Sequence, residues 1–274
     1  MKKFSTTLFS LVPFLTALGL QFVIVFYYMF LSAFVYPFIS SDNNIDLLFS
    51  DMTFNTIISI VWSVICTVFF GIWYYRSCGG HYKPEIKKNW HPLQLVGIVL
   101  MVPATQFATS LLIGIISSIF PKWLEDYEAL MESAGMTGDI PVFMMIYSVC
   151  LAPFSEELIF RGVTMRIARR ALPFWFANLL QAFLFGVFHM NMLQGCYAFA
   201  LGLILGYVCE KGGSIYHAIL FHFLFNLWGT TSTWLSSLSE GLLGSLILFG
   251  VFVLLPLGFV LFQHGIHKKE YRTT

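Results

Sequence analysis

Charged residues are scarce in this chain of 274 residues, where Asp, Glu, Lys and Arg together make up 11%. A soluble domain carries roughly 25% charged residues, so a water-exposed surface of ordinary extent is excluded. Hydrophobic residues account for 58% of the sequence, and 30 residues are phenylalanine. The composition is therefore that of a protein whose main solvent is the lipid bilayer.

Several patterns of soluble or cofactor-dependent function are also missing. The five cysteines form no CxxC pair and lie mostly in apolar runs, which is typical of buried small side chains. The sequence contains no HExxH, no GxSxG and no nucleotide-binding glycine loop. The net charge is +1, and no basic block interleaved with aromatic residues suggests nucleic acid as a partner.

Eight apolar runs are present, and a hydrocarbon core about 30 Å thick needs about 20 helical residues to cross it. The run after Lys2 and Lys3 is too long for a signal peptide and is interpreted as a first span. The runs predict an all-α fold, a polytopic membrane helix bundle of about eight transmembrane helices, with residues 1–274 forming a single domain. The predicted spans are approximately 7–39, 52–75, 91–120, 140–162, 173–191, 193–209, 214–229 and 243–263.

The basic residues predict the orientation, because cytoplasmic segments retain Lys and Arg. With both termini inside, every one of the 15 basic residues except Lys122 falls in a cytoplasmic segment. Lys122 belongs to the segment 121–140, which is rich in acids and is expected to be an extracytoplasmic loop. An odd number of spans would break this division. We therefore expect a multi-pass protein of the plasma membrane with both termini in the cytoplasm.

Ionisable side chains inside the predicted spans gather in one part of the chain. Each costs at least about 2.5–3.5 kcal/mol at the centre of a membrane helix, which makes it a functional candidate. The first three spans contain almost none, so the motif-bearing core is residues 140–229. The candidates are Glu156, Glu157, Arg161, His189, His217 and His222, together with the amide of Asn226.

The two adjacent acids of the fourth span are expected to differ. Glu157 and Arg161 are four residues apart, in the favourable order for an ion pair on a helix. Glu156 points about 100° away around the helix and lacks that partner. A carboxylate in a poorly solvated groove without a neighbouring cation is suited to take a proton from water and return it. The alternative is a structural ion pair with one extra acid.

His189 is predicted to face Glu156. Pro173 disfavours continuation of the fourth helix, and in an antiparallel hairpin residues equally distant from the turn lie level. Both residues are about 16 positions from the turn, or about 24 Å at 1.5 Å per residue. Taken alone, a histidine in an apolar helix is more often a core residue.

His222 and Asn226 are four residues apart and share one face of the seventh span. Two such groups can donate hydrogen bonds to a developing oxyanion, although polar contacts between neighbouring helices are the alternative. His217 lies off that face and is interpreted as structural. Gly202 and Gly206 form a GxxxG pattern that predicts close helix packing.

Three ordered motifs, EExxxR, FxxxH and HxxxN, each in its own span, resemble those of the CPBP family. This family contains CAAX proteases and bacteriocin-processing, Abi-type proteins. The resemblance covers about residues 150–226. It implies an intramembrane endopeptidase that cleaves peptide bonds within the membrane or at its inner surface. The matching residues are Glu156, Glu157, Arg161, Phe185, His189, His222 and Asn226.

The resemblance also implies a role for each motif. Glu156 and His189 would hold and activate the attacking water, and His222 with Asn226 would stabilise the oxyanion. The remaining pair, Glu157 and Arg161, would support the site.

No cofactor is expected on this interpretation, and zinc is the alternative. Glu156, His189 and His222 could hold zinc with one position open, as catalytic zinc sites do. Against zinc, no two histidines of this set stand four residues apart on one helix, and asparagine is an unusual zinc ligand.

The expected partners are the lipid bilayer and a membrane-associated peptide or protein substrate. Modest length and Phe-rich spans are typical of bacterial proteins, so a signalling peptide or bacteriocin leader is a more natural target than a prenylated protein. Two other classes stay open: a non-catalytic immunity or scaffold protein, and a proton-coupled transporter. The transporter is disfavoured because the sequence shows no inverted repeat.

Overall fold

The computed structural model describes residues 2–34, 51–77 and 90–273, and all elements within these stretches are helices. The end of the predicted first span (35–39) lies outside the described residues, as do three lysines of the predicted topology, Lys83, Lys87 and Lys88. Each of the eight predicted ranges contains helix. The predicted all-α, polytopic bundle is confirmed.

The helices before the motif region are α1 (Lys2–Phe9), α2 (Val12–Phe34), α5 (Asp51–Ser77), α7 (Pro92–Ile119) and α8 (Pro121–Ser133). The fourth range holds α9 (Val142–Ile146), η1 (Tyr147–Leu151), α10 (Ala152–Glu157), η2 (Leu158–Met165) and α11 (Arg166–Arg169). The chain continues with α12 (Phe174–Phe188), α13 (Met192–Gly212), α14 (Ile215–Thr231), η3 (Thr233–Ser237), α15 (Glu240–Phe249), η4 (Gly250–Leu254) and α16 (Leu255–Thr273).

Six helical segments among the described residues are long and apolar enough to cross a membrane. The other two predicted ranges hold shorter helices, because α12 has 15 residues and α14 has 17. At 1.5 Å per residue α12 extends about 22 Å, which is less than a hydrocarbon core about 30 Å thick. The end of α12 is therefore expected to lie within the depth of the bilayer.

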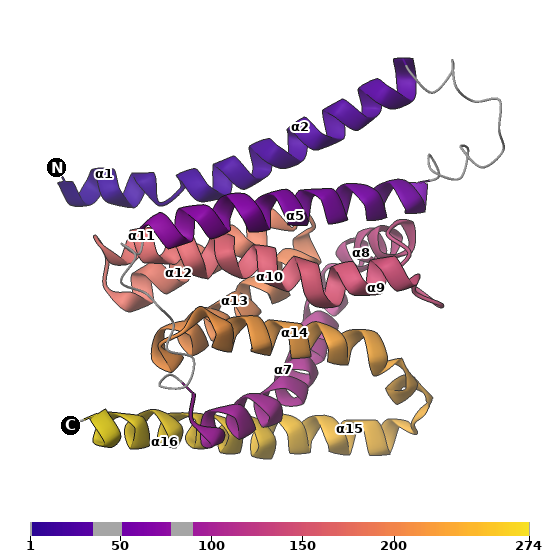
Figure 1. The fold of residues 1–274 in the computed structure, drawn as a ribbon. Helices are drawn as coiled ribbons and strands as arrows, with labels where there is room; N and C mark the ends of the chain where they lie inside the picture. The colour runs from indigo at the N-terminus through magenta and orange to yellow at the C-terminus, as the bar shows by residue number, and fades with distance from the viewer. Residues whose placement is uncertain (1, 35–50, 78–89, 274) are drawn as a thin grey trace.

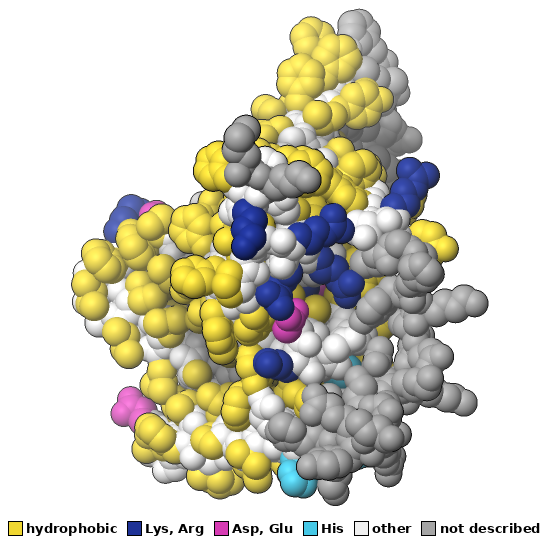
Figure 2. Space-filling view, turned by 90° about the vertical axis from the view of Figure 1, so that its left-hand side faces the viewer, with side chains coloured by type: hydrophobic (Ala, Val, Ile, Leu, Met, Phe, Trp, Pro, Cys, Tyr) yellow, Lys and Arg dark blue, Asp and Glu magenta, His cyan; other side chains and the backbone are white. Residues whose placement is uncertain are grey.

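The bundle has two chemically different ends (Figure 1). Both termini and α11 lie at one end, whereas α8 and the start of α9 lie at the other. Between them α7 crosses obliquely and packs against α14 and α16. Figure 2 looks onto the end with the termini, and the Lys and Arg side chains gather there. Among the residues whose side chains are described, the exposed basic residues that predicted the cytoplasmic side thus gather at one end of the molecule, which we call the basic end.

The segment 121–140 is only partly a loop, because α8 occupies its first half. The signal for this helix was present in the sequence. Trp123, Tyr127 and Met131 are spaced four apart, and all three are half-buried. The Tyr127 hydroxyl lies 3.4 Å from the hydroxyl of Tyr197 on α13. Through such contacts α8 is attached to the bundle at the end opposite the termini.

Glycines let α12 and α13 approach each other closely. A Cβ on Gly186 would lie 2.6 Å from the backbone oxygen of Gly195, and one on Gly202 would lie 3.0 Å from the α12 backbone. A Cβ on Gly206 would overlap side chains of α12. The predicted packing role of the GxxxG pair is confirmed, and this hairpin holds the short α12 in place.

We expect Gly186→Ala to lower the free energy of unfolding by about 1–3 kcal/mol, because the added methyl meets backbone that cannot rotate away. The measurement is unfolding in detergent micelles by heat or by added sodium dodecyl sulfate. Gly244→Ala is the control, since no atom lies within 4 Å of its Cβ position. A Gly186→Ala protein as stable as the Gly244→Ala control would show that α12 and α13 can move apart without loss of stability.

Candidate active site

One cavity of about 730 Å³ collects the four residues that the sequence assigned to catalysis. Glu156, His189, His222 and Asn226 all line it, although they come from three different helical segments. The two supporting residues, Glu157 and Arg161, do not line it and are fully buried. The site therefore has a layer that faces the cavity and a layer sealed behind it.

The sealed layer is centred on Glu157, which accepts two hydrogen bonds at one carboxylate oxygen. Arg161 Nη1 donates to Oε1 over 2.8 Å, so the predicted ion pair is confirmed. His222 Nδ1 lies 2.9 Å from the same oxygen. Arg161 also donates to the carbonyl of Gly202 and packs on the ring of Phe185, 4.5 Å from its centroid. These partners compensate for burying the two charges, which would otherwise be costly.

Glu156 has different surroundings, although it is the next residue. Its side chain faces the cavity, and Oε2 lies 3.8 Å from His222 Nε2. That separation is longer than a hydrogen bond. Because Glu157 occupies Nδ1 of His222, Nε2 is the ring nitrogen directed to the Glu156 side. The imidazole within 4 Å of Glu156 is thus that of His222. His189 lines the same cavity, and its predicted position facing Glu156 stays a prediction.

His189 lies at a turn and not inside a helix. It is the C-cap of α12, and the next residue, Met190, has a left-handed φ of 52°. The His189 Nδ1 lies 2.9 Å from the Phe185 carbonyl. A carbonyl only accepts, so Nδ1 carries the hydrogen and Nε2 is the acceptor of the neutral ring. The side chain of Asn191 then caps α13 by accepting from the Gln194 backbone N–H.

Asn226 is positioned by a defect in the helix that carries the two acids. The stretch η1 is π-helical, so each N–H reaches a carbonyl five residues earlier. The next N–H in that series would come from residue 153, which is proline and has none. The orphaned carbonyl is that of Ser148, and Asn226 Nδ2 donates to it over 2.8 Å. This bond fixes the amide of Asn226 at the cavity wall.

Two amides on α12 belong to the site and were missed in the sequence analysis. Gln181 Nε2 donates to the Gly202 carbonyl over 2.9 Å and to Asn178 Oδ1 over 2.7 Å. The carbonyl of Gly202 therefore accepts from both Arg161 and Gln181. The signal was a pair of amides in an apolar helix, but the candidates predicted from the sequence were ionisable groups and, among amides, Asn226 alone. His217, interpreted as structural, is buried against Trp90, with ring centroids 4.2 Å apart.

The alternative zinc site fits the geometry poorly. Throughout the described stretches, no three His, Cys, Asp or Glu side chains are arranged so that they could hold a metal ion. Glu156, His189 and His222 are therefore not gathered into a metal-holding cluster in this structure.

Residues 138–228 match the family model of Rce1-like type II CAAX prenyl endopeptidases. Over this third of the chain, the sequence is similar to the CAAX-protease family. All residues of both layers of the site lie inside the match, and so do both amides of α12. No curated protein and no solved structure matches the chain. The match confirms the resemblance and supports a CAAX-type intramembrane protease at family level.

Proposed function

We propose that this CAAX-protease-family chain is an intramembrane endopeptidase in which Glu156 is the catalytic base. The observation that supports this assignment is the difference between the two adjacent acids. Glu157 is sealed from the cavity and bound through Oε1 to Arg161 and His222, whereas Glu156 faces a cavity of about 730 Å³. A carboxylate so placed can accept a proton from water when that water attacks a peptide carbonyl.

The other site residues have complementary roles in this proposal. His189 Nε2, an acceptor in the neutral ring, orients the attacking water together with Glu156. The carbonyl oxygen becomes an oxyanion, and His222 donates to it from Nε2 when the ring is protonated. Glu157 at Nδ1 stabilises that imidazolium, as a buried carboxylate does in a hydrolase triad. Glu156 then returns the proton to the leaving amine, which balances the reaction.

The catalytic site is proposed to work without metal and to open away from the basic end. Residues of α8 and of its connection to α9 line the cavity together with Glu156. These elements lie opposite the termini (Figure 1). If the basic end is cytoplasmic, a peptide reaches Glu156 from the extracytoplasmic side. This favours a membrane-associated or exported peptide as substrate over a protein at the inner surface.

The direct test compares the membrane peptides of the native host when it produces wild-type protein or Glu156→Gln. We expect one or a few precursor peptides to persist uncleaved with the variant. Identical peptide sets would reject the peptidase and favour a scaffold or immunity protein. Uptake of a solute by the purified protein in liposomes would instead favour the proton-coupled transporter.

The orientation makes a separate prediction. A reporter fused after residue 168 is expected to report cytoplasm, because it lies within the arginine-rich α11, and one fused near residue 130 is expected to report the exterior. Paired reporters that are active on opposite sides of the membrane provide the measurement. A cytoplasmic signal from the fusion near residue 130 would reverse the topology and with it the side from which substrate enters.

Asn226→Ala is expected to lower kcat by about 10²–10³, the usual effect of removing an oxyanion donor, with little change in KM. Thr230→Ala one turn later is a control, since Thr230 also lines the cavity but bonds only within its own helix. Prolonged chelation should leave activity unchanged. Loss of activity that added zinc restores, together with near-normal Asn226→Ala turnover, would replace the metal-free proposal with the zinc alternative.

A further inference from the structure

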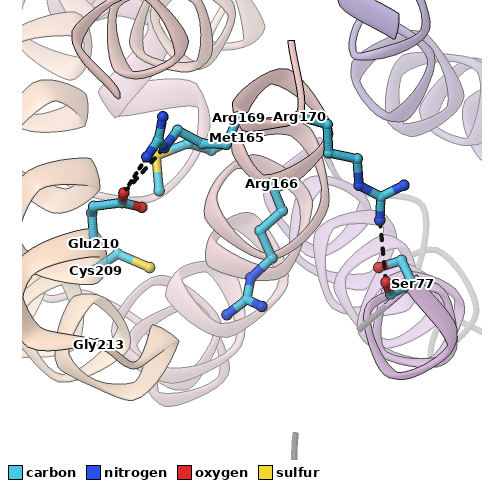
Figure 3. Close-up of a pocket in the computed structure, with 8 residues that line it drawn as sticks. All are labelled: Ser77, Met165, Arg166, Arg169, Arg170, Cys209, Glu210 and Gly213. Atoms are coloured by element: carbon cyan, nitrogen blue, oxygen red, sulfur yellow. Dashed lines mark hydrogen bonds and ion pairs between the residues drawn. The ribbon is translucent and has the colours of Figure 1, made fainter. Parts of the chain in front are cut away.

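A second cavity, of about 460 Å³, lies at the basic end and shares no lining residue with the active-site cavity. We call it the arginine pocket. Figure 3 shows three arginines that leave the end of the fourth helical segment in different directions, between α13 and α5. The pocket is lined by Ser77, Met165, Arg166, Arg169, Arg170, Cys209, Glu210 and Gly213.

Fixed partners spread the three guanidinium groups around the pocket. Arg169 Nε donates to Glu210 Oε1 over 3.0 Å, its Nη2 lies 3.0 Å from the same oxygen, and its Nη1 donates to the carbonyl of Leu172 over 3.1 Å. Arg170 Nη2 donates to the carbonyl of Ser77 over 3.1 Å (Figure 3). Arg166 lies between them, on the ring of Tyr74, with 4.7 Å from its guanidinium carbon to the ring centroid. These contacts keep the three guanidinium groups apart around the cavity, so that they do not all bind to Glu210.

The charge of the arginine pocket is unbalanced. The described residues that line it include three arginines and one glutamate, an excess of two positive charges. A guanidinium group has five N–H donors, of which these contacts use three on Arg169 and one on Arg170. Its planar fork matches the oxygens of a phosphate group. A phosphate in the pocket would therefore balance the charge and engage donors of Arg169 and Arg170.

Exposed aromatic residues place the arginine pocket at the level of lipid headgroups. Trp175 and Phe176, at the start of α12, are each 64% exposed although strongly apolar. The ring of Trp175 stacks on that of Tyr207, with centroids 6.1 Å apart. Trp and Tyr in such positions are typical of the membrane–water boundary. Because only a few residues separate Arg170 from Trp175, we expect the pocket to open at the depth of phospholipid phosphates.

We propose that the arginine pocket binds the phosphate group of an anionic phospholipid, with Arg169 and Arg170 as its main donors. Basic pockets between membrane helices are suited to anionic headgroups. This site is separate from Glu156 and does not depend on the proposed peptidase activity. It would fix the protein in one leaflet and set the depth of the fourth helical segment.

The test titrates delipidated protein in detergent with phosphatidylglycerol, with phosphatidylcholine and, separately, with inorganic phosphate. Bound lipid is measured by native mass spectrometry and the midpoint of thermal unfolding in parallel. We expect wild-type protein to prefer phosphatidylglycerol. Each basic residue near the membrane surface strengthens binding of an anionic lipid about fivefold. The double variant Arg169→Gln/Arg170→Gln should therefore bind phosphatidylglycerol more than about tenfold more weakly. Arg76→Gln/Lys211→Gln removes the same charge at the same end, outside the pocket lining, and should retain the preference.

A variant that binds lipid more tightly tests whether weaker binding by the arginine variants is due to misfolding. Glu210→Gln removes the acid of the pocket and should tighten phosphatidylglycerol binding about fivefold, which a damaged protein would not do. Equal lipid preference in the Arg169→Gln/Arg170→Gln and Arg76→Gln/Lys211→Gln proteins would overturn the proposal. So would stabilisation by millimolar inorganic phosphate equal to that by lipid, because the ligand would then be a soluble anion.

Discussion

Glu156→Gln is expected to lower kcat by at least about 10³, towards the upper end of what a positioned general acid–base contributes. The amide has the same shape as the carboxylate, so packing around the cavity should persist. It cannot accept the proton of the attacking water, however, and cannot return one to the leaving amine. The measurement is single-turnover cleavage by purified protein, with the substrate identified from the native membrane.

A matched control is available within the same cavity. Glu128 of α8 also lines it, and Glu128→Gln makes the same change of charge. We expect this control to keep turnover within a few fold of wild type, with unfolding midpoints similar in both variants. Activity of Glu156→Gln equal to that of Glu128→Gln would remove Glu156 from its assigned role, even if peptide cleavage by the wild-type protein were established.

Glu157→Gln should have its main effect on stability, lowering the free energy of unfolding by about 3–5 kcal/mol. Removing this carboxylate leaves the guanidinium of Arg161, which is fully buried, without its counter-charge. Unfolding in detergent micelles provides the measurement. The amide oxygen can still accept from His222 Nδ1, so the fold should persist under mild conditions. The imidazolium of His222 loses its stabilising charge, and turnover should fall as well.

A double-mutant cycle separates these two effects. Arg161→Met removes the cation while keeping a long side chain, so Glu157→Gln/Arg161→Met should be more stable than the sum of the single losses, by up to about 3 kcal/mol. Turnover should not recover in the double variant, because His222 still lacks its carboxylate. Additive stability losses would mean that the ion pair is not the reason for the loss, and recovered turnover would mean that Glu157 acts only through Arg161.

Much of this architecture could be predicted from the sequence, because a helix that crosses the bilayer must be long and apolar. Length and polarity of the apolar runs predicted helix in all eight ranges, and helical spacing predicted the pair of Glu157 and Arg161. The pairing of His189 with Glu156 assumed two straight helices meeting at Pro173. The structure departs from that assumption in two places, since α12 stops at His189 and π-helical turns flank α10. Neither the end of α12 nor the π-helical turns can be recognised from the spacing of hydrophobic residues in the sequence.

The environment of His222 could not be predicted from spacing at all. It depends on the rotation of α14 against α10, which is fixed by side-chain packing between segments that are far apart in the chain. The same holds for the carbonyl of Gly202, which collects donors from the fourth segment and from α12. Polar groups that satisfy each other across helices are visible in a sequence only as isolated letters in apolar runs.

The hydrogen bond between Asn226 and the Ser148 carbonyl makes two distant positions depend on each other. Proline at 153 creates the need for a side-chain donor, and asparagine at 226 meets it. A chain with alanine at 153 would have a backbone N–H that can donate to that carbonyl. The side chain of residue 226 would then no longer be needed as its donor. Substitutions at the two positions are therefore not independent, and Asn226 has one role in holding the helix and another in the proposed chemistry. Pro153→Ala is the background in which the second role can be measured without the first.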